Sequence, residues 1–251
     1  MRALILSDIH SNIDALEAVL HAAPAYDVVW NLGDVVGYGA TPNEVVERVR
    51  GLGNMFVRGN HDRACSGLIH AEEFNPVALF AVRWTQQELT RENMDWLREL
   101  PRGPVHPDRL RVNCVHGSLQ NEDQYLLSLR DAQQQLEASS AQLTFFGHTH
   151  IQGGFAVNPD EDGITLAPTY SSHDEMDFYE LQIRKGSKYL INPGSVGQPR
   201  DRDWRAAFAL YDSKAQSITF GRVPYMVQAA QIRIQRAGLP ENLGTRLRLG
   251  R

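Results

Sequence analysis

The side chains of this sequence that could do chemistry are Asp, His and Asn residues grouped in five short motifs, and each motif directly follows an apolar run. The five motifs are Asp8-Ile9-His10, Gly33-Asp34, Gly59-Asn60-His61-Asp62, His116-Gly117 and Gly147-His148-Thr149-His150. Taken singly, each motif is a weak signal, because an Asp at the end of a strand more often caps a helix or a turn than binds an ion. Chance assembly of all five in order is improbable, so we interpret them as parts of one site.

The chemical types in these motifs predict a metal site. Carboxylate and amide oxygens together with imidazole nitrogens, and without a thiolate, suit borderline ions such as Mn²⁺, Fe or Zn²⁺. In Asp8-Ile9-His10 and His148-Thr149-His150, side chains two residues apart would share one face if the extended strand geometry continued. Both pairs could therefore aim at one site, although they lie just past the strand ends.

Five apolar runs rich in β-branched and aromatic residues predict buried strands that position these motifs. The runs cover residues 4–7, 28–33, 55–59, 112–115 and 143–147. Helical patterns lie between several of them: 11–23 with Ser11 as its cap, 42–50 opened by Pro42, 76–90 capped by Asn75, a further helix to residue 100, and 131–138. This alternation implies parallel strands, whose carboxyl ends meet at one edge of the sheet where α/β folds bind ligands.

The pattern changes to strands and turns after His150. Strands are expected over 151–157, 164–167, 178–183, 189–191, 206–211 and 217–222, with hairpin turns at 184–188 and 212–214. Residues 158–163 and 169–177 are expected to be surface loops, and Pro224 should open a last helix to about Ala237. Without a repeat or linker, we predict one domain over residues 1–251, with a second sheet packed on the first.

The bulk composition excludes several classes of protein. A chain of 251 residues with 42% hydrophobic and 22% charged residues can bury a large core. A net charge of −5 argues against nucleic-acid or membrane-surface partners, and no apolar run reaches the length of a membrane span. An early acidic residue argues against a signal peptide, and Cys65 and Cys114 are expected to be plain core residues, so we expect a cytoplasmic protein. We assign no site role to four remaining histidines: His21, His70, His106 and His173.

With the five motifs in this order, the sequence resembles the calcineurin-like metallophosphoesterase superfamily, and its smaller bacterial phosphodiesterase-like members most of all. The resemblance covers Leu4 to His150, and residues 192–197 resemble a segment found near the sites of bacterial members. It implies an α/β fold, a four-layer αββα sandwich of two mixed β-sheets flanked by helices.

The resemblance also implies a role for each motif residue. The first metal ion would be held by Asp8, His10 and His150. The second would be held by Asn60, His116 and His148. Asp34 would bridge the two ions, since a carboxylate offers two oxygens, and His61 would stand just outside as the catalytic acid. We expect two divalent ions, Mn²⁺ or Fe, with Zn²⁺ and Ni²⁺ as alternatives.

Such a pair of ions clamps the oxygens of an in-line displacement and lowers the pKa of a bound water to about 7. The implied activity is therefore hydrolysis of a small-molecule phosphate ester by metal-activated hydroxide. Protein Ser/Thr phosphatases of the superfamily carry an Asp-Arg pair where this chain has Gly37-Tyr38, and Glu where it has Asp62. This departure from the protein-phosphatase motif favours a small phosphodiester or a nucleotide as the substrate.

Several alternatives stay open. Tyr38 could stack on a nucleoside or aryl group, and Arg58 is the first choice for a phosphate-binding guanidinium, with Arg200 and Arg202 as substitutes. A phosphomonoesterase or protein phosphatase is one alternative function, and a nuclease is a weaker one. A non-catalytic scaffold, like the retromer subunit on this fold, is another, but the His at position 61 and the full set of ligands favour an enzyme.

Overall fold

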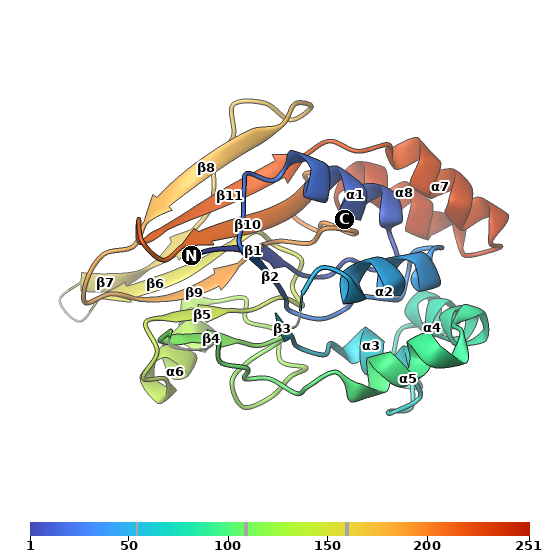
Figure 1. The fold of residues 1–251 in the computed structure, drawn as a ribbon, viewed down its shortest axis with the longest axis horizontal. Helices are drawn as coiled ribbons and strands as arrows, with labels where there is room; N and C mark the ends of the chain where they lie inside the picture. Colours follow the sequence, from blue (N-terminus) through green and yellow to red (C-terminus); the bar gives the residue numbers. More distant parts are fainter. Residues whose placement is uncertain (54, 108–109, 159–160) are drawn as a thin grey trace.

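The computed structural model describes residues 1–53, 55–107, 110–158 and 161–251, which form two β-sheets packed face to face (Figure 1). The six-stranded sheet has the order β3-β2-β1-β10-β11-β8. Its strands are β1 (Arg2–Leu6), β2 (Val28–Asn31), β3 (Met55–Phe56), β8 (Asp177–Gln182), β10 (Ala206–Asp212) and β11 (Ser217–Val223). β1, β2 and β3 are parallel, whereas β10, β11 and β8 pair antiparallel.

The five-stranded sheet has the order β4-β5-β9-β6-β7. Its strands are β4 (Val112–Cys114), β5 (Leu143–Phe145), β6 (Gly153–Asn158), β7 (Glu161–Leu166) and β9 (Lys188–Asn192). β4, β5 and β9 are parallel, and β6 runs antiparallel to both β9 and β7. Both sheets are therefore mixed.

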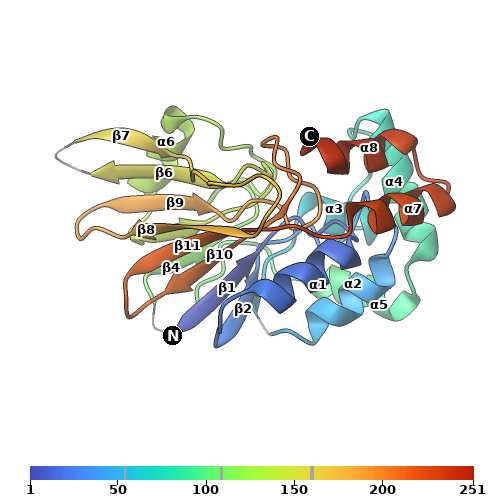
Figure 2. The ribbon, with the colours of Figure 1, turned by 90° about the horizontal axis from the view of Figure 1, so that it is seen from above.

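Helices flank the two sheets (Figures 1 and 2). They are α1 (Ile13–Ala22), α2 (Pro42–Arg50), α3 (Asn60–Cys65), α4 (Pro76–Glu88), α5 (Arg91–Glu99), α6 (Leu129–Ala138), α7 (Val227–Arg236) and α8 (Glu241–Leu249). α6 lies by the five-stranded sheet, and most of the others gather at the end of the molecule opposite the β6–β7 hairpin. One apolar core joins α1, α2, α4, α7 and α8 to the six-stranded sheet, and a smaller one joins α6 to the five-stranded sheet. The expected four-layer αββα sandwich is confirmed.

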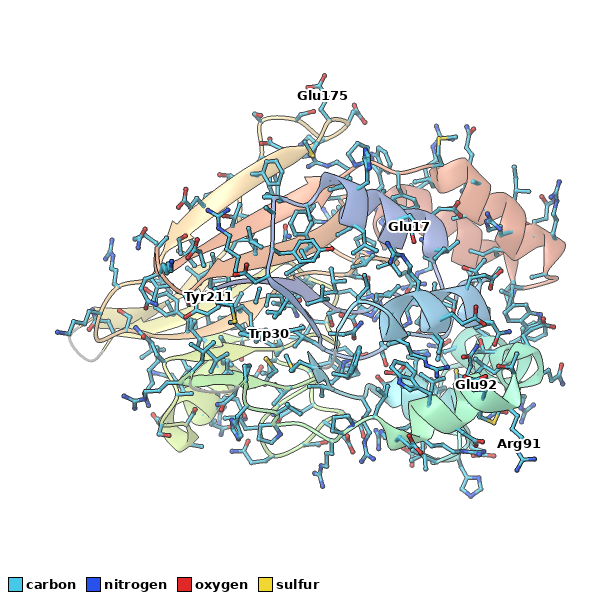
Figure 3. All side chains as sticks on the ribbon, in the orientation of Figure 1. Glu17, Trp30, Arg91, Glu92, Glu175 and Tyr211 are labelled. Atoms are coloured by element: carbon cyan, nitrogen blue, oxygen red, sulfur yellow. The ribbon has the colours of Figure 1, made fainter. Side chains whose placement is uncertain are left out.

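The core between the two sheets fixes their relative position. Trp30 of β2, Phe145 of β5 and Tyr211 of β10 pack ring against ring there, with centroids 5.9–6.2 Å apart. Figure 3 shows Trp30 and Tyr211 in the interior, whereas Glu17 and Glu175 point outward. Large aromatic rings dominate the energy of such cores, so the sheets form a rigid base for the loops at their ends.

The structure corrects several expectations about where elements lie. The five motif-bearing strands do not form one sheet edge: β1, β2 and β3 belong to one sheet, and β4 and β5 to the other. β6 runs to Asn158 and β7 begins at Glu161, so the loop expected over 158–163 is mostly strand, and residues 159–160 lie outside the described residues. The last helices also differ, because α7 begins at Val227 and α8 was not expected.

Local chemistry explains the correction at the first helix. Asn12, not Ser11, caps α1, because the Asn12 side chain accepts a hydrogen bond from the Ala15 amide at 3.2 Å. The expected cap at Asn75 is confirmed, and Pro42 lies in the first turn of α2 as expected.

Within the described residues no helix has the length and apolarity that crossing a bilayer needs. The assignment of residues 1–251 to one domain stays a prediction.

Candidate metal centre

Strained backbone turns aim the motif side chains at one place. Five motif residues have positive φ, a region that residues other than glycine rarely adopt: Asp8 (52°), His10 (49°), Asp34 (54°), His148 (66°) and His150 (59°). Each such residue costs about 1–3 kcal/mol, and such strain gathers at functional sites. The extended alternation considered for Asp8 and His10 is therefore wrong, and left-handed turns bring both side chains inward instead.

The first cluster of possible ligands joins Asp8, His10, Asp34 and His150, whose ligand atoms all lie within 4.8 Å of one another. His10 Nε2 is 3.1 Å from His150 Nε2, and His150 Nε2 is 3.4 Å from Asp8 Oδ1. All four side chains are buried. Burial raises the pKa of Asp8 to about 7, so this carboxylate needs a nearby positive charge to be ionised stably.

The second cluster joins Asp34, His116 and His148, again with ligand atoms within 4.8 Å. His116 Nε2 is 3.1 Å from His148 Nδ1, and Asn60 Oδ1 lies 3.3 Å from the same His116 nitrogen. The amide oxygen of Asn60 thus faces this cluster from the first residue of α3. The structure brings all seven of the expected ligand side chains together.

The outer nitrogen of each imidazole faces a backbone carbonyl oxygen. His10 Nδ1 lies 3.0 Å from the Val36 carbonyl oxygen, and His150 Nδ1 lies 2.6 Å from that of Gln198. His116 Nδ1 lies 2.8 Å from the Leu32 carbonyl oxygen, and His148 Nε2 lies 3.1 Å from that of Asp123. Imidazoles that bind metals are commonly oriented in this way, with the outer N–H donated and the inner nitrogen free to coordinate.

The charge states of the four histidines, in the protein without a bound ion, fit the same arrangement. Burial lowers the pKa values of His10 and His150 well below the usual range and that of His148 to about 3, so these rings are neutral. His116 differs: burial opposes its charge, but the Asp34 carboxylate beside it raises its pKa to about 10. Its proton occupies the place where the second cluster would accept a cation.

Asp34 connects the two clusters through one oxygen. Its Oδ2 is 3.6 Å from His10 Nε2 and 3.4 Å from His116 Nε2, whereas Oδ1 accepts the His61 amide at 2.8 Å. Oδ2 is therefore the oxygen of Asp34 that faces histidines of both clusters. Although burial opposes ionisation, the surrounding imidazoles, His116 foremost, hold the pKa of Asp34 well below its usual range.

Asp62 holds the backbone around Asp34, a role that the sequence did not indicate. Its Oδ2 accepts the amides of Asp34 at 2.8 Å and Gly59 at 2.9 Å. Its Oδ1 accepts the amides of Val35 at 2.8 Å and Val36 at 3.2 Å. A carboxylate offers enough lone pairs for all four donors, so Asp62 ties the loop after β2 to the start of α3.

His61 lies on α3 beside the first cluster. Its ring packs 4.9 Å from the His10 ring, 4.4 Å from Tyr38 and 5.0 Å from Phe74, measured between centroids. Its Nδ1 is buried without a hydrogen-bond partner, and the residue lines the cavity. At Gly37 a Cβ would approach this Nδ1 to 2.5 Å, so only glycine, at φ +91°, permits the close packing. Burial lowers the pKa of His61 to about 4.

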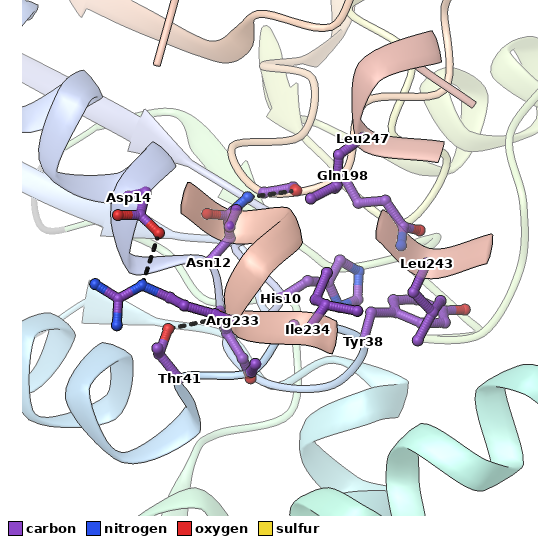
Figure 4. A pocket seen from close by; sticks show the side chains of 15 residues that line it. His10, Asn12, Asp14, Tyr38, Thr41, Gln198, Arg233, Ile234, Leu243 and Leu247 are labelled. Atoms are coloured by element: carbon purple, nitrogen blue, oxygen red, sulfur yellow. Dashed lines mark hydrogen bonds and ion pairs between the residues drawn. The ribbon is translucent and has the colours of Figure 1, made fainter. Parts of the chain in front are cut away.

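A cavity of about 400 Å³ opens over both clusters, a size typical of small-ligand sites. Ligand side chains form its floor: Asp34, Asn60, His148 and His150. The walls include His61, Tyr38, Phe74, Tyr125 and Arg200. Toward α7 and α8 the site is closed, because the space among His10, Tyr38, Ile234, Leu243 and Leu247 is only about 10 Å³ (Figure 4), room for one water at most.

Neither of the two expected substrate-binding residues lies as expected. Tyr38 lines the cavity but is buried, with its ring packed against His10 and His61, so its face is not free for stacking. Arg58 does not line the cavity, because its Nε and Nη2 donate to the Glu122 carboxylate at 2.9 and 3.0 Å. That ion pair anchors the loop after β4, which carries the carbonyl that faces His148. The described arginines that do line the cavity are Arg63, on α3, and Arg200.

The sequence analysis also missed Tyr125. Its ring lies 4.0 Å from the His148 ring at an interplanar angle of 31°, and the side chain is 47% exposed. One face of the ring is therefore covered and the residue still lines the cavity. No motif flags this tyrosine, since only the fold of the loop after His116 brings it to the site.

Comparison with known proteins identifies the family. The calcineurin-like phosphoesterase superfamily model matches residues 1–216. A metallophosphoesterase from Sphaerobacter thermophilus has the same fold, with a TM-score of 0.85, 42% identity and coverage of 100% of this chain and 99% of that one. The chain belongs to the calcineurin-like phosphoesterase superfamily and is a phosphoric ester hydrolase of the metallophosphoesterase type, a family that uses divalent metals.

Two relatives place the chain within this superfamily. The uncharacterized protein MJ0912 of Methanocaldococcus jannaschii is 35% identical over 98% of this chain and 97% of its own length. A symmetrical bis(5'-nucleosyl)-tetraphosphatase of Aeromonas hydrophila is 33% identical, but the match covers 47% of this chain and 45% of that protein. The whole-chain resemblance is therefore to metallophosphoesterases, and the resemblance to the tetraphosphatase is partial.

The contacts of Asp62 generate a prediction. Asp62→Asn should turn an NH₂ group toward two amide donors, and each unsatisfied buried donor costs about 1–3 kcal/mol. We expect a lower urea midpoint and loss of bound metal, because the Asp34 loop is released. Asp131→Asn is the matched control, since Asp131 also accepts backbone amides but in an exposed capping box of α6. Equal midpoints for the two variants, with metal retained, would contradict the role of Asp62.

Proposed function

We propose that this protein is a dinuclear metal-dependent phosphoesterase that hydrolyses a small phosphate ester, with a nucleotide as its substrate class. The observation that carries the proposal is the pair of opposed imidazole nitrogens, 3.1 Å apart, in each of the two clusters. Two nitrogen lone pairs at this distance repel unless a proton or a cation lies between them. Two clusters joined by one carboxylate therefore suit two cations.

The donor set supports the assignment of individual ligands. We assign the first ion to Asp8, His10 and His150, the second to Asn60, His116 and His148, and the shared position to Asp34. Oxygen and imidazole donors without thiolate favour Mn²⁺ or Fe, with Zn²⁺ and Ni²⁺ as alternatives. When bound, such a pair supplies Lewis acidity and an activated water. The described cysteines, Cys65 and Cys114, are buried and unpaired, which supports a reducing, cytoplasmic setting.

His61 is assigned as the general acid for the leaving oxygen. It is tethered beside Asn60, it lines the cavity, and its buried Nδ1 has no hydrogen-bond partner. The buried ring is neutral in the free protein, because burial lowers its pKa to about 4. The general-acid assignment requires a protonated ring, which the charge of an anionic phosphate beside it would favour and the charge of the two cations would oppose.

An aromatic wall supports the nucleotide class. Tyr125 and Phe74 line the cavity together with the apolar side chain of Ile69, and the Tyr125 ring is partly exposed. Stacking of a base on an aromatic ring contributes about 1–3 kcal/mol per base. The partial resemblance to a symmetrical bis(5'-nucleosyl)-tetraphosphatase is consistent with a nucleotide. A scaffold function would need neither the cavity nor His61.

The bridging assignment predicts that Asp34→Ala removes metal from both clusters. Asp34 Oδ2 is the only carboxylate oxygen of the described residues that faces both, and its loss leaves two close cations without a shared counter-charge. Metal analysis of the purified variant should show less than one ion per chain. Two ions per chain, as in the wild type, would refute the bridge.

The general-acid assignment predicts that His61→Gln keeps its metal but lowers kcat about 10²–10⁴-fold on an ester with a poor leaving group. The loss should shrink on a p-nitrophenyl ester, because p-nitrophenolate needs little protonation. Metal content and kcat on both substrates are the measurements. An equal loss on both would show that His61 stabilises bound charge instead of donating a proton.

The nucleotide class predicts a selective effect at the aromatic wall. Tyr125→Ala should raise KM for a nucleoside 5′-monophosphate about 5- to 150-fold, which corresponds to one stacked base. KM for glycerol phosphate, a monoester without a ring, should stay within twofold. Tyr125→Phe is the control that keeps the ring, and metal content shows whether His148 is disturbed. Equal changes for both esters would rule out base stacking on Tyr125.

A further inference from the structure

Arg200 lines the cavity, and its guanidinium has no carboxylate partner among the described residues. It lies between β9 and β10, and its backbone amide donates to the His150 carbonyl at 3.2 Å. Its Nη2 lies 3.4 Å from the Tyr38 hydroxyl and 3.2 Å from Gln198 Oε1, and the guanidinium carbon is 5.8 Å from the centre of the Tyr38 ring. Its Nε is buried without any hydrogen-bond partner.

Several other buried or part-buried arginines among the described residues pair with a carboxylate. Arg58 pairs with Glu122, Arg205 with Asp203, and Arg222 with Asp201. No carboxylate of the described residues lies within ion-pair distance of Arg200. Burying a guanidinium without a counter-charge is unfavourable, so its missing partner is an anion that enters the cavity.

The segment that carries Arg200 is firmly held. Gln152 donates its backbone amide to Asp201 at 3.0 Å, and Arg222 of β11 pairs with the same carboxylate. Two residues on, Asp203 accepts from the Arg205 side chain, which is fully buried. A guanidinium on such an anchored segment loses little further freedom when it binds a ligand, which favours its use in recognition.

We propose that Arg200 binds an unesterified phosphoryl oxygen of the substrate and makes a phosphomonoester dianion the preferred substrate over a diester. This inference rests on the proposed phosphoesterase function. A monoester dianion has one more unesterified oxygen and one more negative charge than a diester, and a planar guanidinium binds such oxygens in pairs. The diester preference expected from the sequence depended on a missing arginine, and Arg200 supplies one from another part of the chain.

The test compares p-nitrophenyl phosphate with bis(p-nitrophenyl) phosphate, using Mn²⁺-loaded wild type, Arg200→Gln and Arg200→Lys. We expect the wild type to have the higher kcat/KM on the monoester. Arg200→Gln should lower the monoester value about 10- to 150-fold, as for the loss of a charged hydrogen bond, and the diester value less than threefold. Arg200→Lys should recover part of the loss, because it keeps the charge without the fork.

Arg202→Gln is the matched control, since Arg202 is exposed and the substitution removes the same charge two residues away. Binding of inorganic phosphate, measured by calorimetry, should weaken at least tenfold in Arg200→Gln and less than twofold in Arg202→Gln. Equal losses on both esters, or unchanged phosphate binding, would overturn the role of Arg200. A wild type that hydrolyses neither ester would refute the proposed function instead, and phosphate binding would then decide on Arg200 alone.

Discussion

Four imidazole rings and two carboxylates face one another in the protein interior, and the rest of the structure keeps them there. Opposed ring nitrogens 3.1 Å apart repel unless a proton or a cation separates them. The outer nitrogens, held at backbone carbonyls, stop the rings from turning away. Positive charge is therefore favoured between the rings of each pair, whether it is a proton, as on His116, or a metal ion.

The two-sheet sandwich can hold this arrangement because its strain is local and its base is rigid. The positive-φ turns sit immediately after β1, β2 and β5, where each loop begins on a buried strand. Asp62 then fixes the loop of Asp34 through four backbone amides. Close packing leaves no room to relax: a Cβ at Gly59 would collide with the Asp34 carboxylate.

The charged groups around the cavity are also arranged locally, although the protein as a whole is acidic, with a net charge of −5. Several arginines away from the cavity pair with carboxylates, as Arg58 does with Glu122. At the cavity, Arg200 has no such partner among the described residues, and the carboxylates of Asp8 and Asp34 face the histidines of the two ligand clusters. The proposed role of Arg200 therefore needs no uniformly basic surface to attract an anion.

The sequence by itself determined the candidate ligand types and their order after apolar runs, because motif residues and strand patterns are local properties of the chain. Its resemblance to the family then implied the four-layer sandwich. It did not determine which sheet β4 and β5 join, since that depends on pairing with β9 and β6, far along the chain. Tertiary structure alone decided that Arg58 is bound to Glu122, that Tyr38 is covered, and that Arg200 and Tyr125 line the cavity. The physical reason is that a side chain's partner is set by which loops meet in space, and no local pattern encodes that meeting.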